Sequence, residues 1–241
     1  MAITSEYRKS ADGALSSSGG KADRLTTVFR QALGAAYAHS TQTLQRWAAI
    51  GPATRRGRRF HSLGSQSVIC WPPTTIMNES HIAIGEHTMV GPHVALSVGM
   101  VEGQEILHTP VIRIGDRCLI GRGSGIVAHF CIEIGDDVWT GHHVYITDQN
   151  HGYEDVSLPI SLQSQPEKAV RIGNRSWIGH GSVILPGVTI GHHVVIGANS
   201  VVTRDVPDYC VAVGAPARVV RQFVDGLGWQ DVAANENDIE R

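Results

Sequence analysis

The sequence predicts an all-β solenoid, in which short strands and tight corners alternate along the chain. Three observations indicate this fold class. The chain of 241 residues contains 25 Val and 21 Ile, and 43 of these 46 residues lie after position 65. Charged residues make up only 17% and aromatic residues only 6%, while glycine is frequent at 27 residues. The third observation is a strict six-residue repeat of aliphatic side chains in the same region, which is typical of a repeat architecture.

The repeat is clearest near the C-terminal end. Six aliphatic residues follow one another there at intervals of six, with a chance probability on the order of 10⁻⁴ or less. Shorter runs with the same six-residue spacing occur upstream, as Ile84, Val90 and Leu96, then Ile114, Ile120, Ile126 and Ile132, and, after a slip of two residues, Ile134, Thr140 and Ile146. The longest run consists of Ile172, Ile178, Ile184, Ile190, Ile196 and Val202.

A period of six fits neither a helix nor a simple alternating strand, but it fits a short strand followed by a corner. Three such units form a triangular coil of about 18 residues, and the coils stack at the inter-strand spacing of about 4.8 Å. The key aliphatic residue is expected to point inward. The residue after it, often glycine, is expected at the corner, where glycine tolerates an unusual φ.

The N-terminal quarter has a different character. Residues 1–20 are rich in Ser, Gly and Ala and are expected to be disordered. Residues 21–65 are expected to form a helix and a basic linker, since apolar residues recur at steps of three and four from Leu25 to Trp47, before Gly51-Pro52. The linker carries a cluster of four arginines in Arg55–Arg59. The sequence leaves open whether this cluster is a solvated loop or contacts an anionic ligand or a lipid-linked acceptor.

The solenoid is expected over residues 66–216, with irregular insertions near 97–113 and 148–170. Long excursions from a regular solenoid are usually functional or form an interface. Residues 217–241 are expected to form a short capping helix and a tail, because apolar residues recur there at helical spacing and a solenoid must cover its last coil.

Composition excludes several classes of protein. The net charge of −2 and the pI near 6.7 argue against nucleic-acid binding. No apolar run has the length of a membrane span, and the polar N-terminus lacks the apolar region of a signal peptide. The four cysteines are widely spaced and form no CxxC pair, which predicts reduced thiols and a cytoplasmic location.

Several motifs resemble those of the hexapeptide-repeat acyltransferases. They are Ile172-Gly173-Asn174-Arg175-Ser176-Trp177-Ile178-Gly179, the stretch Ile184-Leu185-Pro186-Gly187-Val188-Thr189-Ile190-Gly191, the Val-Thr-Arg-Asp of residues 202–205 and the Gly-x-Pro-Ala of residues 214–217. The sequence is most similar to the sugar O-acetyltransferases of the galactoside/maltose and polysaccharide-modifying type. This resemblance implies a left-handed parallel β-helix, acetyl-CoA as acyl donor without a metal, and homotrimers with sites between adjacent chains.

The resemblance also implies roles for individual residues. His151, at the start of the second insertion, matches the catalytic histidine, which would act as general base in direct transfer. A backbone carbonyl or Asp148, Glu154 or Asp155 is expected to orient its other nitrogen. The candidates for the cofactor site, where small residues let the pantetheine arm approach and arginines contact phosphate, are Trp177, Gly179, Ala198, Arg204 and Arg218. The candidates for acceptor binding are Asp148, Asn150, Tyr153 and, in place of an acceptor-positioning asparagine of the family, His129.

Two other functions fit the same fold. A γ-class-like carbonic anhydrase would need three histidines converging on a metal, for which His129, His142 and His143 are candidates, but the paired histidines of that class are missing. A non-catalytic scaffold would bind no coenzyme A. The acceptor, the length of the acyl group and the choice between O- and N-acylation stay open at this point.

Overall fold

The computed structural model describes residues 21–106 and 108–232, and the chain divides into two units, residues 1–47 and 48–241. The first unit contains helix α2 (Lys21–Ala48), which confirms the helix expected before Gly51-Pro52. The leader of residues 1–20, expected to be disordered, lies outside the described residues. None of the helices in the described part of the chain has the length and hydropathy of a membrane span.

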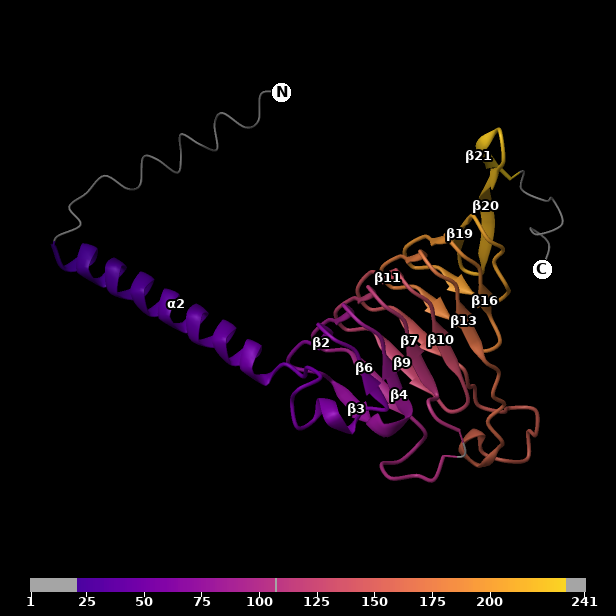
Figure 1. Cartoon of the computed structure of the whole chain (residues 1–241), viewed down its shortest axis with the longest axis horizontal. Coiled ribbons are helices and arrows are strands. Elements are labelled where there is room, and N and C mark those ends of the chain that lie inside the picture. Colours follow the sequence, from indigo (N-terminus) through magenta and orange to yellow (C-terminus); the bar gives the residue numbers. More distant parts are fainter. Residues whose placement is uncertain (1–20, 107, 233–241) are drawn as a thin grey trace. The chain divides into compact units, whose positions relative to one another are not determined.

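The second unit is a three-sided parallel β-helix (Figure 1). We number its sheets 1 to 3 in the order in which each coil visits them. Sheet 1 consists of β1 (Ser62–Leu63), β4 (Ile82–Ile84), β7 (Ile112–Ile114), β10 (Ile132–Ile134), β13 (Val170–Ile172) and β16 (Thr189–Ile190). Sheet 2 consists of β2 (Val68–Ile69), β5 (Met89–Val90), β8 (Leu119–Ile120), β11 (Trp139–Thr140), β14 (Trp177–Ile178), β17 (Val195–Ile196), β19 (Cys210–Gly214), β20 (Ala217–Val224) and β21 (Gly228–Asp231). Sheet 3 consists of β3 (Thr75–Met77), β6 (Ala95–Val98), β9 (Gly125–Ala128), β12 (Tyr145–Thr147), β15 (Val183–Ile184) and β18 (Val201–Val202).

The six-residue register is confirmed residue by residue. All members of the predicted runs are buried, and the aliphatic ones form a single core between the three sheets. Equivalent residues of successive coils pair directly, for example Ile134 with Ile172 and Ile178 with Ile196. Full burial of one such side chain contributes about 1.5–3 kcal/mol, so stacking of coils supplies the stability that no single coil has. The parallel pairing and the triangular coil fit the left-handed form of the β-helix.

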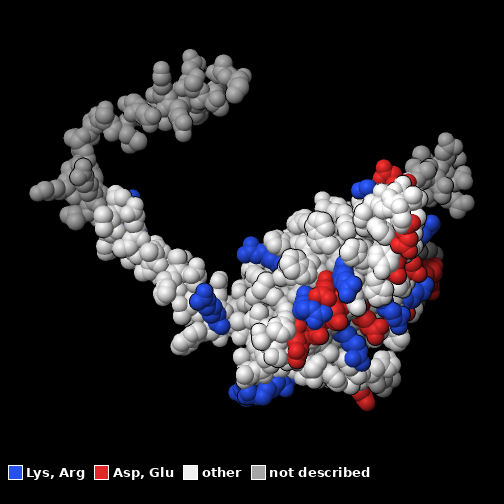
Figure 2. Space-filling model, turned by 45° about the horizontal axis from the view of Figure 1, so that its top comes forward, with Lys and Arg blue, Asp and Glu red and all other residues white. Residues whose placement is uncertain are grey.

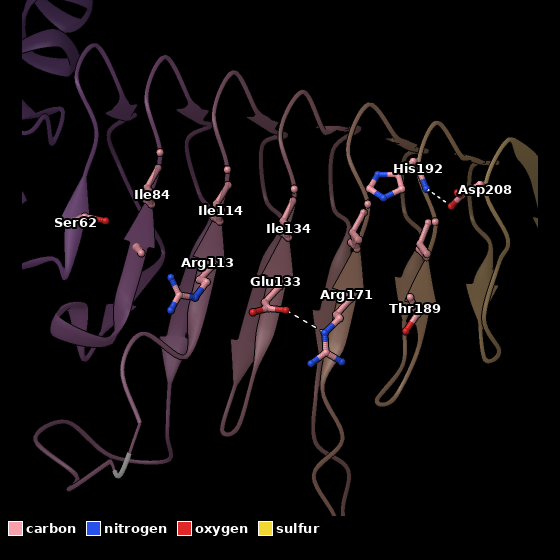
Figure 3. Close-up of a pocket in the computed structure, with 18 residues that line it drawn as sticks. Ser62, Ile84, Arg113, Ile114, Glu133, Ile134, Arg171, Thr189, His192 and Asp208 are labelled. Carbon is pink, nitrogen blue, oxygen red and sulfur yellow. Dashed lines mark hydrogen bonds and ion pairs between the residues drawn. The ribbon is translucent and has the colours of Figure 1, made fainter.

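A row of hydrogen bonds links the coils at the edge between sheets 1 and 2. A side chain at this corner accepts the backbone N–H of the equivalent residue one coil earlier. The acceptor residue follows a corner glycine in every coil except the last, where Asp208 follows Pro207. The bonds run from Glu86 N to Asp116 Oδ1 (2.7 Å), Asp116 N to Asp136 Oδ1 (2.9 Å), Asp136 N to Asn174 Oδ1 (3.0 Å), Asn174 N to His192 Nδ1 (3.0 Å) and His192 N to Asp208 Oδ1 (2.8 Å; Figure 3). We call this series the acceptor ladder.

The expected role of the corner glycines was wrong. The left-handed φ values fall mainly on non-glycine residues two positions later, such as His87 (55°), Asp137 (57°) and His193 (55°). The glycines are required for another reason, because the next coil lies directly against them. A Cβ on Gly135, for example, would overlap Oδ1 of Asn174 in the acceptor ladder.

Two long connections interrupt the repeat, in the regions where the sequence predicts insertions. The first connects β6 to β7, and the second connects β12 to β13 and contains a 3₁₀ turn, η3 (Ile160–Leu162). Both therefore leave from the edge between sheets 3 and 1, which we call the 3/1 edge.

The predicted C-terminal capping helix was wrong. Residues Ala217–Val224 form strand β20, antiparallel to β19, and Gly228–Asp231 form β21, antiparallel to β20. The backbone groups of β19 would otherwise be an unpaired sheet edge, and the β-branched Val219 and Val220 favour a strand. The dipeptide Asp225-Gly226, with a left-handed Gly226, makes the turn and is a hairpin signal.

The basic cluster has a partner within the chain. Arg56 precedes the 3₁₀ turn η1 (Gly57–Arg59) and Arg59 ends it. Their guanidinium groups lie 3.0 and 3.4 Å from the carboxylate of Glu79 in the turn η2 (Glu79–His81). The Glu79 side chain is only 5% exposed. Two of the four arginines thus neutralise a buried carboxylate at the first coil.

The acceptor ladder can be tested at His192, where an imidazole does what an amide does in the preceding coil. Because Asn174 N–H donates to Nδ1, His192→Ala removes one acceptor and is expected to cost about 1 kcal/mol of unfolding free energy. His192→Asn places Oδ1 at the equivalent position and should retain most of that stability. Urea unfolding of the two variants and the parent provides the measurement. Equal stability of the alanine and asparagine variants would contradict the ladder.

Candidate active site

The two insertions meet at the 3/1 edge around a cavity of about 540 Å³. Its lining is polar and rich in amides and contains two ionisable side chains, His129 and Glu167. Residues from both insertions contribute, so the cavity exists only where the regular repeat is interrupted, after β6 and again after β12 two coils later. The lining residues are Met100, Gln104, His129, Ser161, Leu162, Gln163, Gln165 and Glu167.

Asp148 anchors the second insertion to the coil below. It is fully buried, and its carboxylate accepts the backbone N–H groups of His129 (2.9 Å), Phe130 (2.8 Å) and Cys131 (2.6 Å). Three charge-assisted bonds occupy this carboxylate. The structure therefore gives Asp148 a supporting position, and not the acceptor-facing position expected from the sequence.

Beyond Asp148 the insertion begins as a short antiparallel ribbon. Residues 148–152 run beside residues 164–168, with hydrogen bonds from Lys168 N to Asp148 O (2.7 Å) and from Gly152 N to Ser164 O (2.8 Å). His151 lies on this ribbon and is exposed. Its Nδ1 is 3.3 Å from Nε2 of Gln165, a residue that also lines the cavity.

The carboxylates expected to orient His151 have other partners. Glu154 accepts the N–H of Tyr153 at 3.0 Å. Asp155 accepts hydrogen bonds from the N–H and hydroxyl of Ser157, and these bonds lower the pKa of Asp155. The side chain that contacts His151 is instead an amide, Gln165. The acceptor candidates Asn150 and Tyr153 flank His151 and are exposed, Tyr153 by 70%.

His129 and Glu167 form a pair inside the cavity. Nδ1 of His129 lies 3.4 Å from Oε1 of Glu167, and the imidazole is only 11% exposed. The structure thus brings His129 close to the ribbon that carries His151. Sequence reasoning missed Glu167 and Gln165. Their signal was the polar run Gln163-Ser164-Gln165-Pro166-Glu167 where the insertion rejoins the repeat.

Three of the cofactor candidates gather around sheet 2. Trp177, in β14, is 55% exposed, so its indole lies on the outer face of that sheet. Gly179 and Ala198 follow β14 and β17 at the edge between sheets 2 and 3. A Cβ on Gly179 would overlap the backbone at Ala198, so coil stacking alone requires a glycine there.

The two arginine candidates lie on different parts of the β-helix. Arg218 lies in β20, which extends sheet 2, and its Nη1 donates to the carbonyl of Ala217 (3.0 Å). Arg204 follows β18 and is exposed at the 3/1 edge, which is also the edge from which the second insertion leaves.

Within one chain, His151 and Trp177 lie on opposite sides of the β-helix. His151 lies on the insertion that leaves from the 3/1 edge, whereas Trp177 projects from the outer face of sheet 2. The aliphatic core lies between them. A site that uses both residues therefore needs two copies of the chain.

A second hollow, of about 620 Å³, runs along the outer face of sheet 1 (Figure 3). Arg113, Glu133 and Arg171 lie side by side there, and Arg171 Nε is 3.0 Å from Glu133 Oε2. None of the candidate site residues lines it. Acidic and basic side chains are interspersed on the face shown in Figure 2, and neither sign forms a continuous patch there.

The four thiols are poor nucleophiles. Burial raises the pKa of each, to about 11 for Cys118. The thiolate form is therefore scarce near neutral pH. Among the described residues, no group of three or more His, Cys, Asp or Glu side chains is placed to hold a metal ion.

Comparison with known proteins agrees with this fold. The family profile described as "Bacterial transferase hexapeptide (six repeats)" matches residues 169–204, and "Hexapeptide repeat of succinyl-transferase" matches residues 111–147. A probable acetyltransferase of Mycobacterium tuberculosis, Rv3034c, is 40% identical over 55% of this chain, which spans only 43% of that protein.

Two relatives are covered over most of their length. The galactoside O-acetyltransferase of Escherichia coli is 36% identical over 63% of this chain and 68% of its own. The putative lipopolysaccharide biosynthesis O-acetyl transferase WbbJ of the same organism is 32% identical over 63% of this chain and 76% of its own.

Among solved structures, the N-acyltransferase AntD from Bacillus cereus, in complex with dTDP and 3-hydroxybutyryl-CoA, superposes with a TM-score of 0.55 at 22% identity, over 68% of this chain and 84% of that one. This likeness concerns the fold. The six-residue repeat, the three-sided β-helix and the match to O-acetyltransferases over most of their length agree with it. The chain belongs to the hexapeptide-repeat acyltransferase family.

Proposed function

We propose that this protein transfers an acetyl group from acetyl-CoA to a hydroxyl group of a sugar or glycan. The observation that carries the proposal is the placement of His151. It lies on an anchored ribbon beside a polar cavity, and Gln165 contacts both. The names of the two relatives matched over most of their length, a galactoside and a lipopolysaccharide O-acetyltransferase, support a hydroxyl acceptor.

In the proposed mechanism, neutral His151 removes the proton of the acceptor hydroxyl as its oxygen attacks the thioester carbonyl. The tetrahedral intermediate collapses, the carbon–sulfur bond breaks, and the imidazolium returns the proton to the leaving thiolate of coenzyme A. No covalent enzyme intermediate is needed. The raised pKa values of the four thiols support this direct route.

The acceptor would occupy the cavity at the 3/1 edge. His129 and the amides of Gln104, Gln163 and Gln165 can donate and accept hydrogen bonds with hydroxyl groups. Asn150 and Tyr153 would complete this side of the site. Asp148 would act as a positioning residue, since it holds the backbone of residues 129–131 against the base of the ribbon.

The donor would lie along sheet 2 of a neighbouring chain. The exposed Trp177 would contact the pantetheine arm, and the small residues Gly179 and Ala198 would let the arm approach backbone groups. Arg204 and Arg218 would contact its phosphates. Because one chain presents His151 and Trp177 on opposite sides, we propose a homotrimer with sites between adjacent chains. The four free thiols fit a reaction in the cytoplasm.

The role of His151 can be tested by His151→Asn, which retains a polar side chain but removes the base. Acetyl transfer is expected to fall by about 10²–10⁴-fold, because general-base catalysis contributes this much. His87→Asn is the matched control, since His87 is an exposed corner histidine far from the second insertion in the sequence, and asparagine tolerates its left-handed φ of 55°. Thiol release from acetyl-CoA with a panel of sugars measures the rate. Full activity of the His151 variant, at unchanged oligomeric size, would refute its role as base.

The shared site predicts complementation between two inactive variants. When His151→Asn and Trp177→Ala chains are unfolded, mixed and reassembled, some interfaces pair an intact His151 with an intact Trp177. Random assembly of equal amounts should restore about one quarter of the parental activity. Each variant reassembled alone is the control. Activity that does not rise on mixing, although mixed oligomers form, would mean that each site is built from one chain.

A further inference from the structure

The C-terminal hairpin carries two aromatic rings to the last coils of the β-helix. Phe223 in β20 and Trp229 in β21 are direct cross-strand partners. The hairpin is fixed to the corner of the last coil by a hydrogen bond of 2.9 Å from Phe223 N to Tyr209 O. Tyr209 and His193 occupy equivalent corner positions of successive coils, each with a left-handed φ of 55°. Two rings from the hairpin thus meet two rings from the coil corners.

The four rings form a closed cycle. Neighbouring ring centroids are separated by 5.9 Å for His193 and Tyr209, 6.4 Å for Tyr209 and Phe223, 5.8 Å for Phe223 and Trp229, and 6.5 Å for Trp229 and His193. The planes of Phe223 and Trp229 are inclined by 71°, those of Tyr209 and Phe223 by 51° and those of His193 and Tyr209 by 39°, whereas His193 and Trp229 are stacked at 25°. The rings are therefore arranged as the walls of a cup and not as a single stack.

The cup is open and has one acidic member. It encloses a cavity of about 370 Å³ lined by the four rings and by Asp225, from the turn of the hairpin. Tyr209 is 49% exposed and Phe223 40% exposed. Rings that packed only against each other would expose less apolar surface, and a concave aromatic surface of this kind is typical of a binding site. The five lining residues include no lysine or arginine, so they offer an anionic group no positive partner apart from His193.

An organic cation fits this chemistry. In a planar square with sides of this length, the centre would lie about 4 Å from each centroid, inside the ~6 Å range over which an aromatic face attracts a cation. Methylated ammonium groups are well suited, because their methyl groups contact the rings while their charge is not strongly hydrated. Asp225 adds a carboxylate that complements this charge. We propose that the cup of His193, Tyr209, Phe223, Asp225 and Trp229 binds a trimethylammonium group.

The proposal does not depend on acetyl transfer, since none of the five residues belongs to the candidate active site. The probe is choline, titrated against the full chain at constant ionic strength and followed by ligand-observed NMR of its N-methyl protons. The uncharged isostere dimethylbutanol is the matched ligand control. Choline is expected to bind saturably and about tenfold more tightly than dimethylbutanol, because only choline gains the cation–π and carboxylate interactions. Equal affinity of the two would overturn the proposal.

Two variants test the residues. Asp225→Asn removes the charge from an exposed turn, and Phe223→Leu removes one ring while it preserves an apolar strand residue. Each is expected to weaken choline binding about fivefold or more. Trp139→Phe, at an exposed tryptophan of sheet 2 outside the cup, should leave binding unchanged, and thermal melting verifies that the variants fold. Unchanged binding in both cup variants would refute the assignment.

Three further probes identify the source of the group. Binding of phosphocholine would favour a phospholipid headgroup, and binding of a trimethyllysine amide would favour a modified peptide. Either result supports the proposal. Adenosine monophosphate tests the different idea that the cup stacks a flat base. If it binds and choline does not, the cation assignment is wrong.

Discussion

The close contact between successive coils determines the rest of this structure. Each coil buries its aliphatic residues only because the next coil lies one strand spacing away, and that spacing leaves no room for a Cβ at the corner glycines. The acceptor ladder has the same origin, since the side chain of one coil must reach the backbone N–H of the coil before it. Glycine and the acceptor that follows it are thus two consequences of a single distance. The ladder tolerates Asp, Asn or His, because each offers an acceptor atom at the same position.

The regular part of the fold was predictable because this contact imposes a local period. A residue such as Ile178 occupies its place through a pattern that six-residue spacing reveals. The C-terminal hairpin was not predictable in this way. Val219, Val220 and Phe223 have the spacing of an amphipathic helix, and the deciding factor is the open edge of β19, which only the assembled sheet presents. The Asp225-Gly226 dipeptide is a local hairpin signal, whereas the spacing of the apolar residues around it predicts a helix.

The candidate site shows the same division. His151 could be nominated from its place in a motif, because the insertion begins at a fixed point of the repeat. Its surroundings could not. Asp148 looked like an acceptor ligand, yet the three backbone N–H groups that occupy it come from residues 129–131, one coil away. Glu167 could not be nominated from the sequence, because only the folded insertion places it beside His129. Such pairings depend on how irregular segments fold back, and no period encodes them.

The anchoring of the second insertion bears on how this family could change its acceptor. Asp148 and the hydrogen bonds of residues 148–152 with residues 164–168 fix the base of the excursion, and His151 lies within this fixed part. The outer part differs, since Val156 is 99% exposed and Leu162 70% exposed. Apolar side chains this exposed are expected to be covered by a neighbouring chain in the proposed trimer. Substitutions in the outer part would therefore reshape the acceptor cavity and the contact between chains without displacing the proposed base. Because the insertion is anchored at its base, the position of His151 and the specificity for the acceptor can change independently.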